Sequence, residues 1–248
     1  MSIIPLPNKI SWEEVGPNEA TLTIEPCNAG FGTTLGNTLR RVLLSSLQGA
    51  AVTKVKIKKV DHEFSTIPGV KEDVVEIMLN LKNLRVRSLV DEPAKLHLKL
   101  KGRLGEIKSS DFEKNADIEI IDNDFTIATV TDKKADIDME LTIEKGRGYS
   151  PVEERKNEEK EVGVLYLDAF FSPVKKVGYD VTPARVGQDI NYDKLVMSIK
   201  TDGSISPQQA SDNAIAIVLE HFQLLSEYTK TESEIKVKAK SKKKVEKE

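Results

Sequence analysis

Four segments of the chain alternate apolar residues with polar or charged ones, and this alternation constrains the fold more than any other feature. Val55 and Ile57, for example, stand between lysines. Successive side chains of a β-strand point to opposite faces, so each segment predicts a strand with one buried and one solvated face. The alternating segments are residues 21–24, 54–58, 95–101 and 136–144, with weaker strand signals at residues 125–130, 162–169, 177–181 and 195–199. No GxGxxG motif follows a strand, which favours the α+β class with antiparallel sheets over a doubly wound fold.

Two segments show helical spacing instead. In the first, leucines and a valine recur on one stripe from Leu35 to Leu47, and Gly49 is suited to a left-handed cap that ends the helix. In the second, the stripe runs from Val70 to Leu81, with Glu72 and Asp73 in the predicted first turn, where the helix dipole favours anions.

A third helix is predicted from a capping signal. Ser206 is a good N-cap and Pro207 suits the first helical position. Apolar residues then occupy more than one side of the helix as far as Leu225. A sheet covers one face only, so the other face requires a second helix of this chain or a partner chain. The pattern therefore indicates oligomerisation and leaves a cover within the chain open.

Charge is distributed unevenly. The 248 residues carry a formal net charge of −3, but residues 230–248 are rich in lysine and contribute +4. The remaining body is acidic, which disfavours a domain that grips a nucleic-acid backbone. The segment from Lys236 onward has few apolar residues and is predicted to be disordered. A nucleic-acid-binding arm is the alternative for this segment, and a solvated chain end is favoured.

Composition also limits the compartment and the organisation of the chain. The single cysteine, Cys27, allows no disulfide within one chain. The sequence shows no membrane-spanning stretch and no secretory signal, which predicts a cytoplasmic protein without membrane contact. Predicted helices near both ends bracket a strand-rich middle, so we expect a smaller unit inserted into a larger one, with an exposed loop at residues 150–161.

The sequence offers little for catalysis. His62, His97 and His221 are isolated, and no motif surrounds Cys27. There is no GxSxG motif and no P-loop, and the glycines of residues 30–36 are interpreted as shaping a tight helix start. We therefore predict no catalytic residue, no cofactor and no metal site.

One local feature does suggest an interaction surface. Arg40 and Arg41 point about 100° apart on the first helix, so at least one leaves its apolar stripe, and Leu44 lies off the stripe as well. An exposed arginine beside a leucine is typical of an interface anchor, because arginine is enriched among interface hot spots.

Long blocks of the sequence resemble the bacterial-type RNA polymerase α-subunit family. The block GFGTTLGNTLRRVLLSSLQGAAVT begins at Gly30 and HEFSTIPGVKEDVVEIMLNLK begins at His62. Further blocks match in the family's order, at residues 146–149, 167–188 and 193–210. Together they extend over nearly all of residues 1–229, which makes the resemblance highly specific.

The resemblance implies a dimerisation subdomain built from both ends of the chain, at residues 1–48 and 163–229. It also implies an inserted β-rich subdomain at residues 49–162, followed by the lysine-rich segment 230–248. The two long helices match the family's dimer-forming helices. The implied homodimer interface comprises Leu35, Leu39, Val42, Leu43, Ala214, Ile217, Val218, Phe222 and Leu225.

The family homodimer is a non-catalytic scaffold on which the polymerase subunits β and β′ assemble. By the resemblance, Arg41 and Leu44 match positions that contact β, and His62 and Glu63 lie in the same region. Lys82 and the block that contains Asp168 match the area associated with β and β′ docking. We transfer these residues as patches.

The family's small DNA-binding domain, which follows a linker in most members, has no counterpart in these 248 residues. Either the chain is a truncated form or the natural protein lacks this domain, and the source is a bacterium or a plastid. DNA contact is therefore implied only through the assembled polymerase. Two other classes remain open: an enzyme with its own site, and a stand-alone protein-interaction or nucleic-acid-binding dimer.

Overall fold

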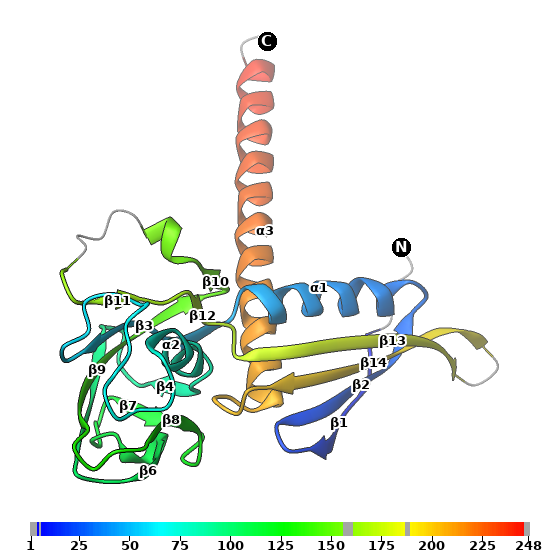
Figure 1. The fold of residues 1–248 in the computed structure, drawn as a ribbon. Coiled ribbons are helices and arrows are strands. Elements are labelled where there is room, and N and C mark those ends of the chain that lie inside the picture. Colours follow the sequence, from blue (N-terminus) through cyan, green and yellow to red (C-terminus); the bar gives the residue numbers. More distant parts are fainter. Residues whose placement is uncertain (1–3, 5, 156–160, 187–188, 246–248) are drawn as a thin grey trace.

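The computed structural model describes residue 4 and residues 6–155, 161–186 and 189–245. Side chains are described as far as residue 228, residues 189 and 190 excepted. The chain forms two units side by side, from which one long helix projects (Figure 1). We call residues 48–172 the inserted unit, and residues 9–47 together with 173–245 the terminal unit. All strand pairs are antiparallel, which confirms the predicted α+β class.

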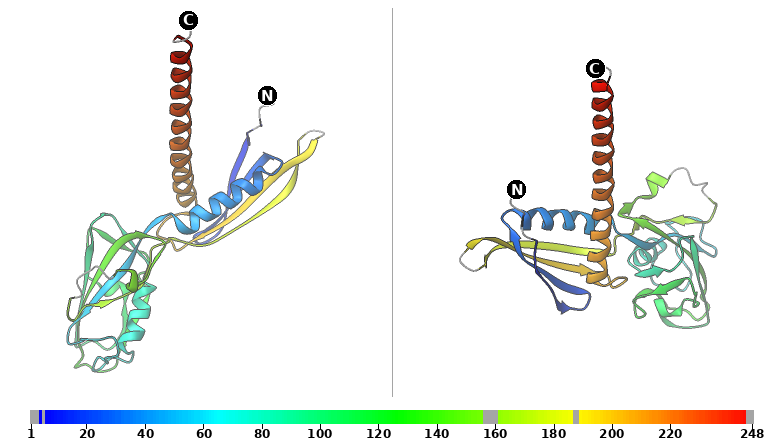
Figure 2. Two further views of the ribbon diagram at one scale, coloured as in Figure 1. Left: turned by 90° about the horizontal axis from the view of Figure 1, so that it is seen from above. Right: turned by 180° about the vertical axis from the view of Figure 1, so that it is seen from behind.

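The terminal unit is a four-stranded sheet crossed by a helix. The sheet order is β1 (Lys9–Gly16), β2 (Glu19–Asn28), β14 (Asp189–Thr201) and β13 (Val174–Val186). Helix α1 (Phe31–Ser45) lies along one face of this sheet, and the first turns of α3 (Pro207–Val245) pack beside it (Figures 1 and 2). Leu22 pairs with Met197 and Ile24 with Leu195, and these side chains form the buried core beneath α1.

Glycines allow α1 to lie directly on the sheet. A Cβ at Gly36 would come within 2.7 Å of the Tyr179 ring, and one at Gly32 within 2.9 Å of Val181. Gly30 adopts a left-handed conformation with φ of 83° at the N-cap. Only Gly30 therefore shapes the helix start as predicted, while the other two provide close packing, which a local sequence pattern does not reveal.

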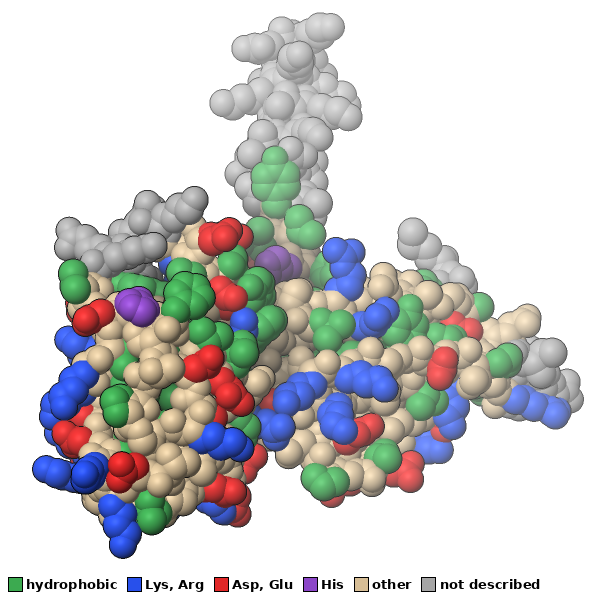
Figure 3. Space-filling model, in the orientation of Figure 1, with side chains coloured by type: hydrophobic (Ala, Val, Ile, Leu, Met, Phe, Trp, Pro, Cys, Tyr) green, Lys and Arg blue, Asp and Glu red, His purple; other side chains and the backbone are tan. Residues whose placement is uncertain are grey.

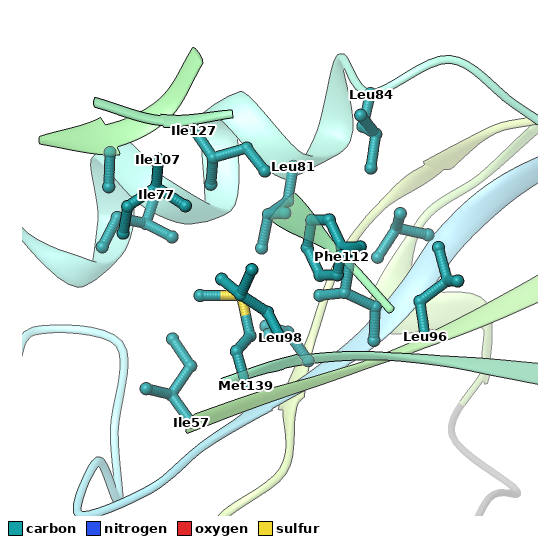
Figure 4. Close-up of a cluster of buried hydrophobic side chains, with 14 of the residues drawn as sticks. Ile57, Ile77, Leu81, Leu84, Leu96, Leu98, Ile107, Phe112, Ile127 and Met139 are labelled. Atoms are coloured by element: carbon teal, nitrogen blue, oxygen red, sulfur yellow. The ribbon is translucent and has the colours of Figure 1, made fainter. Parts of the chain in front are cut away.

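The inserted unit encloses a larger core. Its main sheet has the order β11 (Leu165–Tyr166), β3 (Gln48–Ile57), β9 (Asp136–Arg147) and β5 (Ala94–Lys101). Helix α2 (Val74–Lys82) covers this sheet, with Ile77 and Leu81 pointing towards Leu98 and Met139 (Figure 4). The smaller elements are β4 (Val86–Ser88), β6 (Gly105–Lys108), β7 (Ile118–Ile120), β8 (Thr126–Val130), β10 (Tyr149–Ser150), β12 (Ala169–Phe170) and the 3-10 turns Ser109–Asp111 and Val152–Arg155.

The predicted start of α3 is confirmed. Helix α3 begins at Pro207, and Ser206 and Gln209 form a reciprocal capping box: the Gln209 N–H donates to Ser206 Oγ at 3.2 Å and the Ser206 N–H donates to Gln209 Oε1 at 3.3 Å.

Three other expectations about helix ends were wrong. Helix α2 begins at Val74, with Asp73 as its N-cap, so Val70 lies outside it. Helix α1 ends at Ser45 and leaves Leu47 in the connection. Gly49 is a residue of β3, where it pairs with Gly146, rather than a helix cap. Glycine is needed there because a Cβ would lie 1.9 Å from the Phe171 carbonyl oxygen.

Two expected boundaries also differ from the structure. Leu165 and Leu167 are buried in the core of the inserted unit, so that unit continues past residue 163, as far as residue 172. Helix α3 extends to Val245, through most of the segment expected to be disordered, while residues 246–248 lie outside the described residues. Lysine and glutamate are good helix formers and no glycine or proline follows Pro207, which accounts for the continuation. Residues 156–160 of the predicted exposed loop are likewise outside the described part.

Candidate protein-interaction surfaces

Helix α3 carries an apolar surface that the rest of the chain does not cover. The exposed fractions are 53% for Leu219, 62% for Phe222 and 57% for Leu225, and Leu224 and Tyr228 are also exposed. Hydrophobic side chains gather along α3 where it leaves the body of the molecule (Figure 3). We call Ile215, Leu219, Phe222 and Leu225 the α3 face. Such a contiguous exposed apolar surface is typical of a protein-protein contact.

The structure divides the predicted dimer residues into two groups. Leu39, Leu43 and Ala214 are buried in the core of the terminal unit, so they support the helices from within and present no surface to a partner. The others retain exposure: Leu35, Val42, Ile217 and Val218 are half-buried, and Phe222 and Leu225 are exposed. Helical spacing cannot separate these groups, because both belong to apolar stripes.

A second candidate surface is a hollow beside α2 in the inserted unit. Its volume is about 410 Å³. We call it the α2 groove and define it by Glu63, Phe64, Val75, Leu79, Lys82 and Asp168. Phe64 is 80% exposed and Leu79 55% exposed. The groove thus combines exposed apolar side chains with charges of both signs.

An ion pair at the end of the α2 groove connects residues far apart in the sequence. Lys82 Nζ lies 3.1 Å from Asp168 Oδ2, and the Val152 N–H donates to Asp168 Oδ1 at 3.0 Å. The Val152 hydrogen bond, followed by that of Lys82, lowers the pKa of Asp168 below its usual value. Partial burial and a hydrogen bond to Asp168 raise the pKa of the Tyr149 hydroxyl. Asp168 is therefore ionised at neutral pH and holds Lys82 in a defined position.

Two aromatic residues extend this surface towards α1. The Tyr149 and Phe170 rings stack with centroids 4.5 Å apart, and Lys82 Nζ lies 5.1 Å from the Phe170 centroid. The next residue along the chain, Phe171, donates its N–H to the Gly148 carbonyl. No strand is predicted at Tyr149 from the sequence, because two-residue strands leave no periodic signal.

The end of α1 meets the same surface. Ser172 Oγ donates to the Leu44 carbonyl at 3.2 Å, and Gly148 packs near the Ser45 carbonyl. Arg41 is exposed, one turn earlier on α1, whereas Leu44 is half-buried against the core of the terminal unit. The structure thus brings Lys82, Asp168, Tyr149 and Phe170 together and places the α1 end beside them.

His62 and Glu63 lie in an exposed turn at the other side of the groove. Ser65 Oγ is 3.1 Å from His62 Nδ1, a contact within this turn, and Glu63 lines the groove. Both predicted docking patches therefore belong to one side of the inserted unit and the adjoining end of α1.

Several other titratable residues have partners within the fold. The N-terminus of α1 binds an internal carboxylate: the N–H groups of Gly30 and Gly32 donate to Asp193 Oδ2 at 2.8 and 3.2 Å. His221 Nδ1 lies 2.8 Å from the Ile217 carbonyl oxygen, and His97 Nδ1 is 3.6 Å from Glu140. Burial, reinforced by Asp193, raises the pKa of the Cys27 thiol and keeps it protonated.

No group of three or more histidine, cysteine, aspartate or glutamate side chains suited to a metal occurs within the part of the chain that the structure describes. Among the helices of that part, none has the length and hydropathy to cross a membrane.

The two-unit α+β fold thus carries two candidate interaction surfaces, an apolar helix face and a charged aromatic groove. The description "RNA polymerase Rpb3/RpoA insert domain" belongs to the family model that matches residues 55–172, close to the bounds of the inserted unit. The chain belongs to the family of α subunits of DNA-directed RNA polymerase.

Several curated relatives carry the name DNA-directed RNA polymerase subunit alpha. The relative from Alkaliphilus oremlandii is 54% identical over 202 residues, which are 82% of this chain and 63% of the relative. The relative from Aquifex aeolicus is 46% identical over 88% of this chain and 69% of its own length. The relative from Roseiflexus is 43% identical over 91% of this chain and 69% of its own length. The chain thus spans about two thirds of the length of these relatives.

Proposed function

We propose that this chain is the homodimeric scaffold on which the β and β′ subunits of RNA polymerase assemble for DNA-templated transcription. The observation that carries the proposal is the α3 face, an exposed apolar surface that the rest of the chain does not cover. A second copy of the chain offers the same apolar face and can cover it by two-fold symmetry. The terminal unit then acts as the dimerisation subdomain.

The α2 groove and the adjoining end of α1 form the proposed docking surface for β and β′. Exposed Phe64 and Leu79 supply apolar area, the Lys82–Asp168 pair supplies oriented charge, and Arg41 lies at the α1 end. Apolar anchors with oriented charges beside them are the usual composition of an interface hot spot. In a symmetric dimer this surface occurs twice, once for each large subunit.

Nucleotidyl transfer resides in β and β′ in this proposal, and the chain contributes binding surface. DNA is contacted only through the assembled polymerase, and the working compartment is the cytoplasm. The His and Cys side chains described above have structural partners, which supports a role without catalysis by this chain.

Co-expression of the chain with β and β′ tests the proposal. We expect a complex with two copies of this chain and one of each large subunit, measured by gel filtration with light scattering. Lys82→Gln should reduce the recovery of the complex, because it removes the charge held by Asp168. The matched control is Lys58→Gln, which breaks the Lys58–Asp136 pair elsewhere on the inserted unit. Failure of the parent chain to bind either large subunit would refute the proposal.

A further inference from the structure

The two units are connected at a narrow crossing. The chain passes from the terminal unit to the inserted unit at residues 47–49 and returns at residues 171–173. These crossings lie side by side, since Gly49 approaches the Phe171 carbonyl so closely that no Cβ fits between them. The main hydrophobic clusters of the two units have no residue in common. We call these two adjacent crossings the hinge, because any change in the angle between the two units would occur there.

Two arginines contact the other unit across a cleft at this hinge. Arg87 Nε donates to the Ser204 carbonyl at 2.7 Å, and its Nη2 donates to the same oxygen. Arg85 Nη1 donates to the Asp202 carbonyl at 3.2 Å. Glu119, on the neighbouring strand β7, holds Arg87 Nη1 at 2.9 Å and so orients the guanidinium group. The cleft, about 570 Å³ in volume, is lined by Arg87 and Ser204 among others.

The segment that receives these hydrogen bonds leads directly into α3. Asp202 Oδ1 accepts hydrogen bonds from the Ser204 N–H and Oγ at 2.8 and 2.6 Å, so the loop is ordered by its own contacts. Gly203, with φ of 98°, sits where a Cβ would meet Asn18 of the terminal unit at 2.9 Å and Ile121 of the inserted unit at 3.3 Å. Ser206 then caps α3. Arginines of the inserted unit therefore bind the base of the helix that carries the α3 face.

We propose that Arg85 and Arg87 form a clamp that fixes the angle between the inserted unit and α3. In a dimer this angle sets the separation of the two α2 grooves, and this second part of the proposal rests on the proposed function. Charge-assisted hydrogen bonds with a planar guanidinium group define direction as well as distance. A fixed angle favours binding of two large partners by the dimer, because each partner then meets a preformed groove.

Distance measurement between the units tests the clamp. Spin labels at Lys99→Cys on β5 and Lys176→Cys on β13 report the angle, and the buried Cys27 is shielded from labelling. Labelled chains are diluted with unlabelled ones, so that only distances within one chain contribute. We expect one narrow distance distribution in the parent, and a broadened or shifted distribution in the double variant Arg85→Gln, Arg87→Gln.

The matched control is Arg103→Gln. Arg103 binds Asp111 and the Glu106 carbonyl within the inserted unit, so its loss should leave the distance distribution as in the parent. If the double variant shows the same distance distribution as the parent, the clamp proposal is wrong. Circular dichroism establishes whether the double variant folds; if it does not, Arg85→Gln alone is judged by the same criterion.

Measuring the affinity for β distinguishes a failure of the clamp proposal from a failure of the proposed function. We expect the double variant to bind β about tenfold more weakly than the parent, the change that corresponds to ~1.4 kcal/mol. A broadened distance distribution with parental affinity would overturn the second part of the proposal. If the parent itself does not bind β, the proposed function fails, while the distance measurement still decides whether the arginines hold the two units.

Discussion

The two units of the chain differ in how completely they bury their apolar residues. In the inserted unit, α2 and the surrounding strands bury Leu98, Leu141 and Ile143 completely within one large core. In the terminal unit, α1 and the first turns of α3 cover one face of a sheet, and α3 then continues outward with Leu219 and Phe222 exposed. Under the proposed function, the inserted unit is complete as one copy, whereas the terminal unit is completed by a second copy.

The largest expected effect on stability comes from a substitution in the core of the inserted unit. Leu141→Ala removes a fully buried side chain from the centre of β9, and we expect it to lower the free energy of unfolding by about 3 kcal/mol, because the cavity cannot collapse. Denaturant titration measures this loss. A loss below about 1 kcal/mol would contradict the description of Leu141 as part of a tightly packed core.

The second prediction concerns the open face. Leu219→Asp combined with Phe222→Asp should convert the dimer to a monomer, because two carboxylates would be buried without partners in the contact. Gel filtration with light scattering measures the mass, and Glu220→Gln on the same helix is the control. An unchanged dimer would remove the α3 face from the interface. Ile217→Asp is expected to break the dimer too, but Ile217 also packs against the chain's own core, which makes it the less selective variant.

A third prediction compares neighbouring residues of α1. Arg41→Ala should leave the dimer intact and weaken binding of β by about tenfold, the scale of a lost charged hydrogen bond in an interface. Arg40→Ala is the matched control, since Arg40 is also exposed on α1 and differs in the direction it points. Co-purification of β measures the effect. Equal losses for both variants would show that charge on α1 matters rather than the position of Arg41.

The smallest expected effect is the dependence of stability on acid. The folded-state pKa of Asp168 lies below its ordinary value of 3.8, so the carboxylate stabilises the fold above that pH. This stabilisation is lost as the pH falls from 3.8 through the lowered folded pKa. The difference in unfolding free energy between parent and Asp168→Asn should therefore shrink in this range, and it should be modest because the side chain is 35% exposed. A difference that stays constant as the pH falls through this range would show that the ion pair is not its source.

Local sequence patterns predicted the elements whose formation depends on residues close together in the sequence. Alternation identified β3, β5 and β9, since one solvated face leaves a period of two in the sequence, and Ser206 with Pro207 predicted where α3 begins. Gly32, Gly36 and Gly49 could not be interpreted in this way, because what they permit is the close approach of Tyr179, Val181 and Phe171 from distant segments.

The sequence by itself determined the α+β class, the apolar helix that needs covering, and the family, through long blocks in a fixed order. Tertiary structure alone decided which apolar residues remain exposed, as it buried Leu43 and left Phe222 in solvent. It also joined Lys82 to Asp168, and Arg87 to Ser204, across 86 and 117 positions of the chain. The physical reason is that burial and charge pairing depend on distances in space between residues that lie far apart in the sequence. Local sequence patterns do not contain these distances.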